Sequence, residues 1–135
     1  MIVSHVLDGA RIATRIGDKF ALDCDQPAPF GDDRAPAPFD LFLSGIAACT
    51  AYFAQRYCRK WKLPHDGITV ELEPVFNAQH ALTDVRLRVL VPPSFPPEHH
   101  AGLLRNASAC PVKKALETPP TLSLELVEDR RGRDE

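Results

Sequence analysis

Two cysteines, Cys49 and Cys110, are the residues of this sequence best suited to redox chemistry. A thiol reacts as its thiolate, so its reactivity depends on burial and on nearby positive charge. Pro111 directly follows Cys110, and proline is favoured at the first position of a helix. A helix that starts there leaves the Cys110 thiol beside free backbone N–H groups at the positive end of the helix dipole, and Lys113 and Lys114 follow. The sequence therefore predicts thiolate character at Cys110.

Cys49 lies within the apolar run APFDLFLSGIAACTAYFAQRYCRKW, residues 37–61. On a helix it shares a face with residues three and four positions away, among them Ile46, Tyr52 and Phe53. Cys58 is half a turn away around the same helix, so these two thiols cannot pair within one straight helix. A redox partner for Cys49 must come from another part of the chain. The alternative is packing alone, because a free cysteine often behaves as a small buried hydrophobe.

Other reactive side chains give weaker signals. Cys24 and Cys58 are predicted to pack, and the chain has no zinc-finger cysteine spacing. The adjacent His99 and His100 diverge on a helix and lack a carboxylate–histidine spacing, so no metal site and no cofactor are predicted. A cysteine hydrolase that uses Cys49 with a distant histidine is disfavoured, because no signature of that class is present.

Composition limits the classes of function. With 135 residues and a formal net charge of -2, the chain is expected to form one domain over residues 1–128 with a polar tail at 129–135. The charges are mixed in sign, so neither nucleic acid nor a membrane surface is an expected partner. The most apolar window, residues 41–54, is shorter than a membrane span. No secretory signal is visible at the N-terminus, and a cytoplasmic location is expected.

The elements that must position the cysteines can be placed from sequence periodicity. Segments 2–7, 11–16 and 19–24 are β-prone and are separated by the turn-forming pairs Asp8-Gly9 and Gly17-Asp18, which predicts a three-stranded meander. A proline-rich loop, 26–38, then leads into a long helix over residues 39–62. This helix is apolar nearly all round in its first turns, so it must be surrounded by protein.

The second half of the chain predicts a hairpin, two helices and a strand. Residues 68–76 and 83–91 alternate with a period of two, which sets Glu71 and Glu73 opposite Arg86 and Arg88 and leaves the apolar face for the long helix. Helices are expected at 98–109 and 111–118, and a last strand at Leu122, Leu124 and Leu126. The order β-β-β-α-β-β-α-α-β is an α+β pattern.

Two strings, DRAPAPFDLFLSGIAACTA and ASACPVKKAL, resemble the paired cysteine motifs of the OsmC/Ohr family, the osmotically inducible protein C and organic hydroperoxide resistance proteins. The resemblance implies an intertwined homodimer whose central helices pack against curved antiparallel sheets, with active sites at the subunit interface. It also implies a thiol-dependent peroxidase that reduces small organic hydroperoxides. Cys49 would become a sulfenic acid, Cys110 would resolve it into a disulfide, and an external dithiol would reopen that disulfide.

Around this pair, an apolar pocket is expected to select organic peroxides, formed by Phe39, Phe42, Ile46, Tyr52 and Phe53. The helix-dipole argument favours Cys110 as the more acidic thiol, whereas the resemblance assigns the attack to Cys49, and we follow the resemblance.

The sequence departs from the family at the group that activates the thiolate. The peroxidases of this family carry a glutamate ten residues before the attacking cysteine, and Phe39 stands there in this chain, followed by Asp40. Arg34, Arg11 and Arg15 are the candidates for an activating base, and we favour Arg34 because its loop leads straight to the site. The departure keeps a second hypothesis open, a redox-sensing or apolar-ligand-binding protein without efficient peroxidase turnover.

Overall fold

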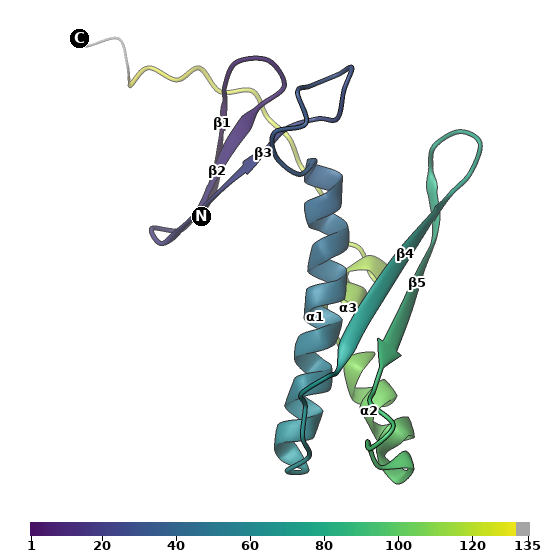
Figure 1. Cartoon of the computed structure of the whole chain (residues 1–135). Helices are drawn as coiled ribbons and strands as arrows, with labels where there is room; N and C mark the ends of the chain where they lie inside the picture. The colour runs from purple at the N-terminus through teal and green to yellow at the C-terminus, as the bar shows by residue number, and fades with distance from the viewer. Residues whose placement is uncertain (132–135) are drawn as a thin grey trace.

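The computed structural model describes residues 1–131 and has the α+β architecture that the sequence predicts (Figure 1). The elements follow in this order: β1 (Ile2–Val6), β2 (Ile12–Ile16), β3 (Phe20–Cys24), α1 (Pro38–Lys60), β4 (Thr69–Phe76), β5 (Leu82–Leu90), the short 3-10 helix η1 (Pro97–His99), α2 (His100–Ala107) and α3 (Pro111–Glu117). The sheets are antiparallel, with strand orders β1-β2-β3 and β4-β5.

The predicted meander is confirmed. Strand β2 lies between β1 and β3, and both turns contain a glycine with positive φ, 66° at Gly9 and 58° at Gly17. Residues other than glycine rarely adopt this conformation, which explains the glycines at both turns. Ser4 and Thr14 face each other across β1 and β2 with their hydroxyl oxygens 2.8 Å apart.

Helix α1 is the central element of the structure. Pro38 starts it, and the Asp40 carboxylate accepts the Ala37 backbone N–H at 3.1 Å, so the first turn is both proline-initiated and capped. Arg59 and Lys60 lie in the last turn, where positive charge suits the helix dipole. In the part of the chain that the structure describes, no helix combines the length and the apolar character needed to cross a membrane.

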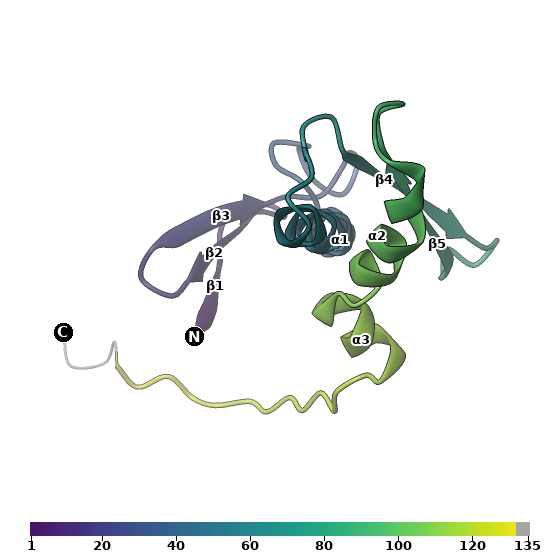
Figure 2. The same cartoon turned by 90° about the horizontal axis from the view of Figure 1, so that it is seen from below.

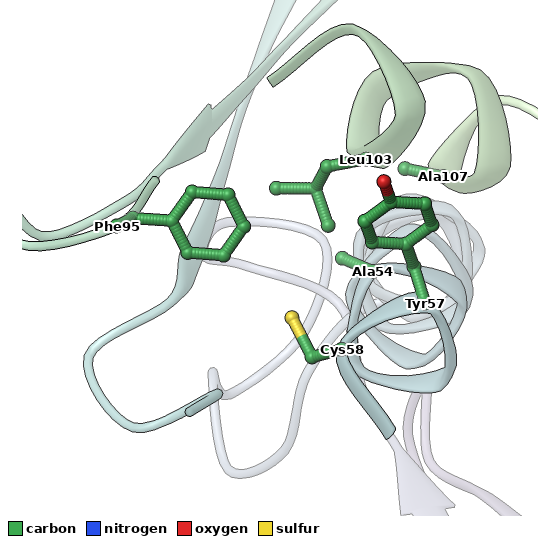
Figure 3. Packing of buried hydrophobic residues seen from close by; sticks show 6 residues of the cluster. All are labelled: Ala54, Tyr57, Cys58, Phe95, Leu103 and Ala107. Atoms are coloured by element: carbon green, nitrogen blue, oxygen red, sulfur yellow. The ribbon is translucent and has the colours of Figure 1, made fainter. Parts of the chain in front are cut away.

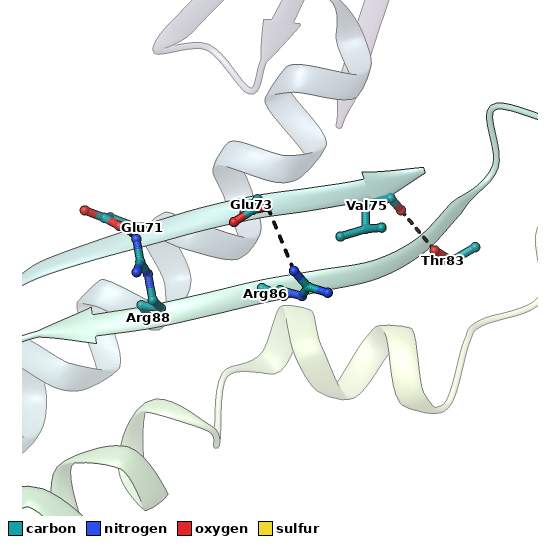
Figure 4. A network of polar contacts seen from close by, with 6 residues as sticks. All are labelled: Glu71, Glu73, Val75, Thr83, Arg86 and Arg88. Carbon is teal, nitrogen blue, oxygen red and sulfur yellow. Dashed lines mark hydrogen bonds and ion pairs between the residues drawn. The ribbon is translucent and has the colours of Figure 1, made fainter. Parts of the chain in front are cut away.

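The β4–β5 hairpin has the register that the charges predict. Glu71 pairs with Arg88 and Glu73 with Arg86, and both form ion pairs on the exposed face, the second at 4.0 Å (Figure 4). The Thr83 hydroxyl donates a hydrogen bond to the Val75 carbonyl oxygen at 3.2 Å. The opposite face is apolar, partly buried, and lies against α1.

The hydrophobic core lies where the second half of α1 meets α2. Its buried members are Ala54, Tyr57, Cys58, Phe95, Leu103 and Ala107 (Figure 3). Gly102 on α2 faces the Tyr57 ring so closely that a side chain at this position would collide with the tyrosine hydroxyl. Cys58 is fully buried in this core, and burial raises the pKa of its thiol. The prediction that Cys58 packs is therefore confirmed, as it is for the buried Cys24.

The last predicted strand is wrong for the single chain. Leu122, Leu124 and Leu126 have no regular secondary structure, and Leu124 and Leu126 are 101% exposed. A strand needs a neighbouring strand to satisfy its backbone groups, and no strand of the described chain pairs with this segment. The tail runs instead from α3 towards the side of the meander (Figure 2).

The predicted polar tail, residues 129–135, follows this segment. Residues 129–131 of the tail are described, with Arg131 bonded to the Asp129 carboxylate, and residues 132–135 lie outside the described residues. One domain over residues 1–128 stays a prediction.

Candidate functional site

The fold brings Cys49 and Cys110 into direct contact. Cys49 lies in the middle of α1, and Cys110 is the residue immediately before α3, which packs against α1. The two thiol groups are hydrogen-bonding neighbours, and both are free. We refer to them below as the cysteine pair. Two residues far apart in the chain are thus brought within hydrogen-bonding range of each other.

Burial raises the pKa of the Cys49 thiol, and the neighbouring Cys110 thiol raises it further. The backbone N–H of Val112, in the first turn of α3, bonds the Cys49 sulfur and acts in the opposite direction. The free N–H group that the sequence analysis assigned to Cys110 therefore acts on Cys49. Cys49 is also the more accessible of the two, since it is half-buried whereas Cys110 is fully buried. Both observations favour Cys49 as the thiol that meets a substrate.

Within one chain, the structure does not bring Arg34 to Cys49. Arg34 lies in the loop before α1, its side chain is exposed, and Cys49 is about 17 Å further along the helix axis from Pro38. In the described part of the chain, no arginine or lysine is among the groups that shift the pKa of Cys49. The activating role of Arg34 stays a prediction, and so do those of Arg11 and Arg15.

Asp25, which the sequence analysis passed over, organises the loop that carries Arg34. Its side chain is 1% exposed, and its carboxylate accepts backbone N–H groups from Gln26 at 2.7 Å and from Arg34 at 3.1 Å. The hydrogen bond from Gln26 is the largest of the causes that hold the pKa of Asp25 below its ordinary value, and the Arg11 guanidinium contributes to the lowering. A carboxylate just before a proline-rich loop was the signal available in the sequence.

The five residues predicted to form a peroxide pocket fall into separate groups. The Phe39 ring lies 5.4 Å from that of Phe42 and 5.9 Å from that of Phe76, at the start of α1. Tyr52 and Phe53 stack edge to face at 5.3 Å further along the helix, and Ile46 is buried. Tyr52 lines a cavity of about 370 Å³ beside α1, whereas Phe53 lines a different and larger one. A single pocket formed by all five residues stays a prediction.

The larger cavity is a groove of about 860 Å³ between the second half of α1 and the segment from η1 to α3. We call it the basic groove, after its four cationic side chains Arg56, Lys60, Arg105 and Lys114. Aromatic rings form much of the rest of its wall: Phe53, Tyr57, Trp61 and the imidazole of His99. The Tyr57 hydroxyl and His99 Nδ1 are 2.8 Å apart, which links the two walls. Sequence analysis missed the groove because its two walls are distant in the chain.

Across residues 1–131, no group of three or more histidine, cysteine, aspartate or glutamate side chains is placed to hold a metal ion.

Comparisons with known structures agree with this fold. The chain resembles a protein from Psychrobacter arcticus assigned to osmotic stress induction and the detoxification response, with a TM-score of 0.74 and 19% identity over 84% of this chain and 85% of that one. It resembles an OsmC-like protein from Mycoplasma pneumoniae with a TM-score of 0.72 and 16% identity, covering 88% and 87% of the two chains. An organic hydroperoxide resistance protein OsmC from Legionella pneumophila gives a TM-score of 0.57 and 19% identity, covering 86% and 87%. At these identities the likeness establishes the fold.

Sequence comparison assigns the family. No curated protein matches the chain in a direct search. The sequence profile of the OsmC-like proteins matches residues 31–125, a range that includes both cysteines of the pair. This chain therefore belongs to the OsmC-like protein family.

Proposed function

We propose that this protein is a cytoplasmic thiol-dependent peroxidase that reduces organic hydroperoxides through Cys49 and Cys110. The observation that carries the proposal is the direct contact between the Cys49 and Cys110 thiols. Family membership supports it, because a structural relative from Legionella pneumophila is named an organic hydroperoxide resistance protein.

The reaction uses the two thiols in sequence. The Cys49 thiolate attacks the terminal peroxide oxygen, so that an S–O bond forms, the O–O bond breaks and the alcohol leaves after protonation. The Cys110 thiol then displaces water from the Cys49 sulfenic acid, and an S–S bond forms. An external dithiol reopens this disulfide by two exchange steps, and is itself oxidised to a disulfide. Each cycle thus transfers two electrons from the dithiol to the peroxide.

The raised pKa of Cys49 means that activation needs a positive group beyond the Val112 N–H. We assign this group to a second copy of the chain in a homodimer. Exposed apolar side chains support the assignment: Val6 on β1 is 84% exposed and Phe20 on β3 is 65% exposed. The exposed face of α1 also carries the small residues Gly45 and Ala48, which allow a second helix to approach closely. Arg34 or Arg11 of the partner subunit is the expected positive group.

Steady-state consumption of cumene hydroperoxide with dihydrolipoamide tests the proposal. The parent protein is expected to turn over, and Cys49→Ser is expected to lose activity by at least about a hundredfold, since the attacking atom is removed. Cys110→Ser should accumulate a Cys49 sulfenic acid that dimedone traps. Cys24→Ser is the matched control, because it removes a free thiol outside the pair. Peroxide consumption by Cys49→Ser at the parental rate would rule the mechanism out.

A second candidate function, redox sensing without efficient turnover, is favoured by one observation. Among residues 1–131 of a single chain, no cation contributes to lowering the pKa of Cys49. A sensor would form the Cys49–Cys110 disulfide stoichiometrically with peroxide and then stop, even with excess dithiol present. Counting peroxide consumed per protein chain separates the two functions, because a peroxidase consumes many equivalents and a sensor consumes one.

A further inference from the structure

The basic groove has a charge opposite to that of the protein as a whole. The chain carries a formal net charge of -2. Of the described residues that line the groove, four are cationic and only Glu98 is acidic. Among the ion pairs of residues 1–131, none involves Arg56, Lys60, Arg105 or Lys114. A concave site with positive charge that carboxylates do not neutralise attracts an anion.

The cations lie on both walls of the groove. Arg56 and Lys60 belong to α1, whereas Arg105 belongs to α2 and Lys114 to α3. An anion between the walls is therefore bound from both sides. Four cations against one carboxylate suit an anion with more than one negative charge, and a phosphate group carries about two near neutral pH. Guanidinium groups also bind phosphate oxygens in pairs, so the charge pattern favours a phosphorylated ligand.

The groove also offers an accessible aromatic ring beside these cations. Trp61 is 52% exposed, although its ring lies 5.6 Å from that of His99 and 6.2 Å from that of Tyr57. The contact between the Tyr57 hydroxyl and His99 Nδ1 at 2.8 Å fixes these two neighbours. Trp61 is thus supported by other rings and still open to a ligand. A planar ring that stacks on such a side chain gains about 1–3 kcal/mol, and the groove volume of about 860 Å³ is sufficient for it.

The charge of the groove argues against a second protein chain as its occupant. Lysine and glutamate are depleted at protein interfaces, yet Lys60, Lys114 and Glu98 all line the groove. The exposed apolar residues assigned above to the dimer, Val6 and Phe20, belong to the meander, which lies on the other side of α1 (Figure 2). A small molecule is therefore the occupant that the residues favour.

We propose that the basic groove binds a nucleoside phosphate. The planar base stacks on Trp61, and the phosphate oxygens accept hydrogen bonds from Lys60 on one wall and Arg105 on the other. Neither Cys49 nor Cys110 lines the groove, so this site is separate from the cysteine pair. The proposal goes beyond the proposed function and does not depend on it.

Titration calorimetry with three probes separates the two parts of the ligand. ADP carries both a base and phosphates, pyrophosphate carries only the phosphates, and adenosine carries only the base and its sugar. The parent protein is expected to bind ADP saturably, and to bind pyrophosphate and adenosine each at least about tenfold more weakly, since each lacks one set of contacts. No saturable binding of ADP would overturn the proposal. Equal affinity for ADP and either of the other probes would do the same, because one part of the ligand would then contribute nothing.

Two variants assign the binding to the groove. Lys60→Gln/Arg105→Gln removes one cation from each wall, so its affinity for ADP should fall at least about tenfold. The matched control Arg59→Gln/Lys113→Gln makes the same change in net charge at residues that do not line the groove, and should stay within about twofold of the parent. Equal affinities in the two double variants would refute the assignment. Trp61→Leu should weaken ADP about tenfold and leave pyrophosphate unchanged, and equal losses for both probes would refute the stacking.

Sedimentation velocity tests the alternative occupant. Lys60→Gln/Arg105→Gln is expected to keep the oligomeric state of the parent protein, because the groove is assigned to a small molecule. A change of oligomeric state in this variant alone would show that the groove is a contact between chains, and the proposal would be wrong. Failure of the proposed function has a different signature, because Cys49→Ser would then consume peroxide while ADP binding keeps its expected pattern.

Discussion

The two sides of helix α1 differ in how completely the chain covers them. On one side, α2, α3 and the β4–β5 hairpin pack against the helix, and Leu103 and Cys58 are buried (Figure 2). On the other side lies the β1–β3 meander, whose apolar residues are largely exposed. The packed side completes the cysteine pair within one chain. The open side carries Arg11 and Arg34, the residues that we propose activate Cys49 from a second copy of the chain.

The largest effect is expected in the core on the packed side. Leu103→Ala removes a buried side chain between α1 and α2, and should lower the free energy of unfolding by about 2–5 kcal/mol. The matched change on the open side, Leu124→Ala, should alter it by less than about 0.5 kcal/mol in the monomer, because that side chain is fully exposed. Urea unfolding at low protein concentration measures both. Similar losses of unfolding free energy in the two variants would show that both sides of α1 contribute equally to stability.

The next effect concerns the reactivity of Cys49. Its raised pKa should place the midpoint of its iodoacetamide alkylation at a higher pH than that of an ordinary cysteine, and each pH unit below the midpoint slows the reaction about tenfold. Cys110→Ala removes one of the groups that raise this pKa, so the midpoint should move to lower pH. Peptide mass spectrometry across a pH series gives both midpoints. A shift to higher pH would contradict the assigned contact.

On the open side, Asp25 should make the stability of the Arg34 loop depend on pH. Its pKa is lower in the folded protein than in the unfolded chain, so its contribution is present above the unfolded value of about 3.9 and is lost as the pH falls through the folded value. Proteolysis of the loop should therefore accelerate below about pH 4 in the parent. Asp25→Asn should be cleaved faster at neutral pH and depend less on pH. Identical pH profiles would remove Asp25 as the organising group.

The smallest effect is expected at the exposed ion pairs of the hairpin. Arg88→Gln breaks the pair with Glu71 and should cost no more than about 0.2–1 kcal/mol, since exposed pairs are weak. Salt should reduce the difference further. Thermal unfolding at low and high ionic strength checks it, and a loss comparable to that of Leu103→Ala would mean that the hairpin face is buried in the assembly.

Local patterns predicted most of the fold because they act over short distances. The turn glycines Gly9 and Gly17, the helix-initiating Pro38 and the alternating charges of the hairpin each fix a conformation or a register nearby. The strand at Leu122–Leu126 failed for the complementary reason. Its alternation is clear in the sequence, but a strand forms only where another strand pairs with it, and no strand of the described residues does so.

The sequence by itself determined the order of the elements from β1 to α3, the two cysteine motifs and the family to which they belong. Only the tertiary structure decided that the Val112 N–H acts on Cys49, that Asp25 holds the Arg34 loop, and that four cations gather in one groove. The physical reason is distance along the chain. Periodicity and capping are properties of neighbouring residues, whereas burial, charge clustering and thiol contact depend on segments that meet only when the helices pack.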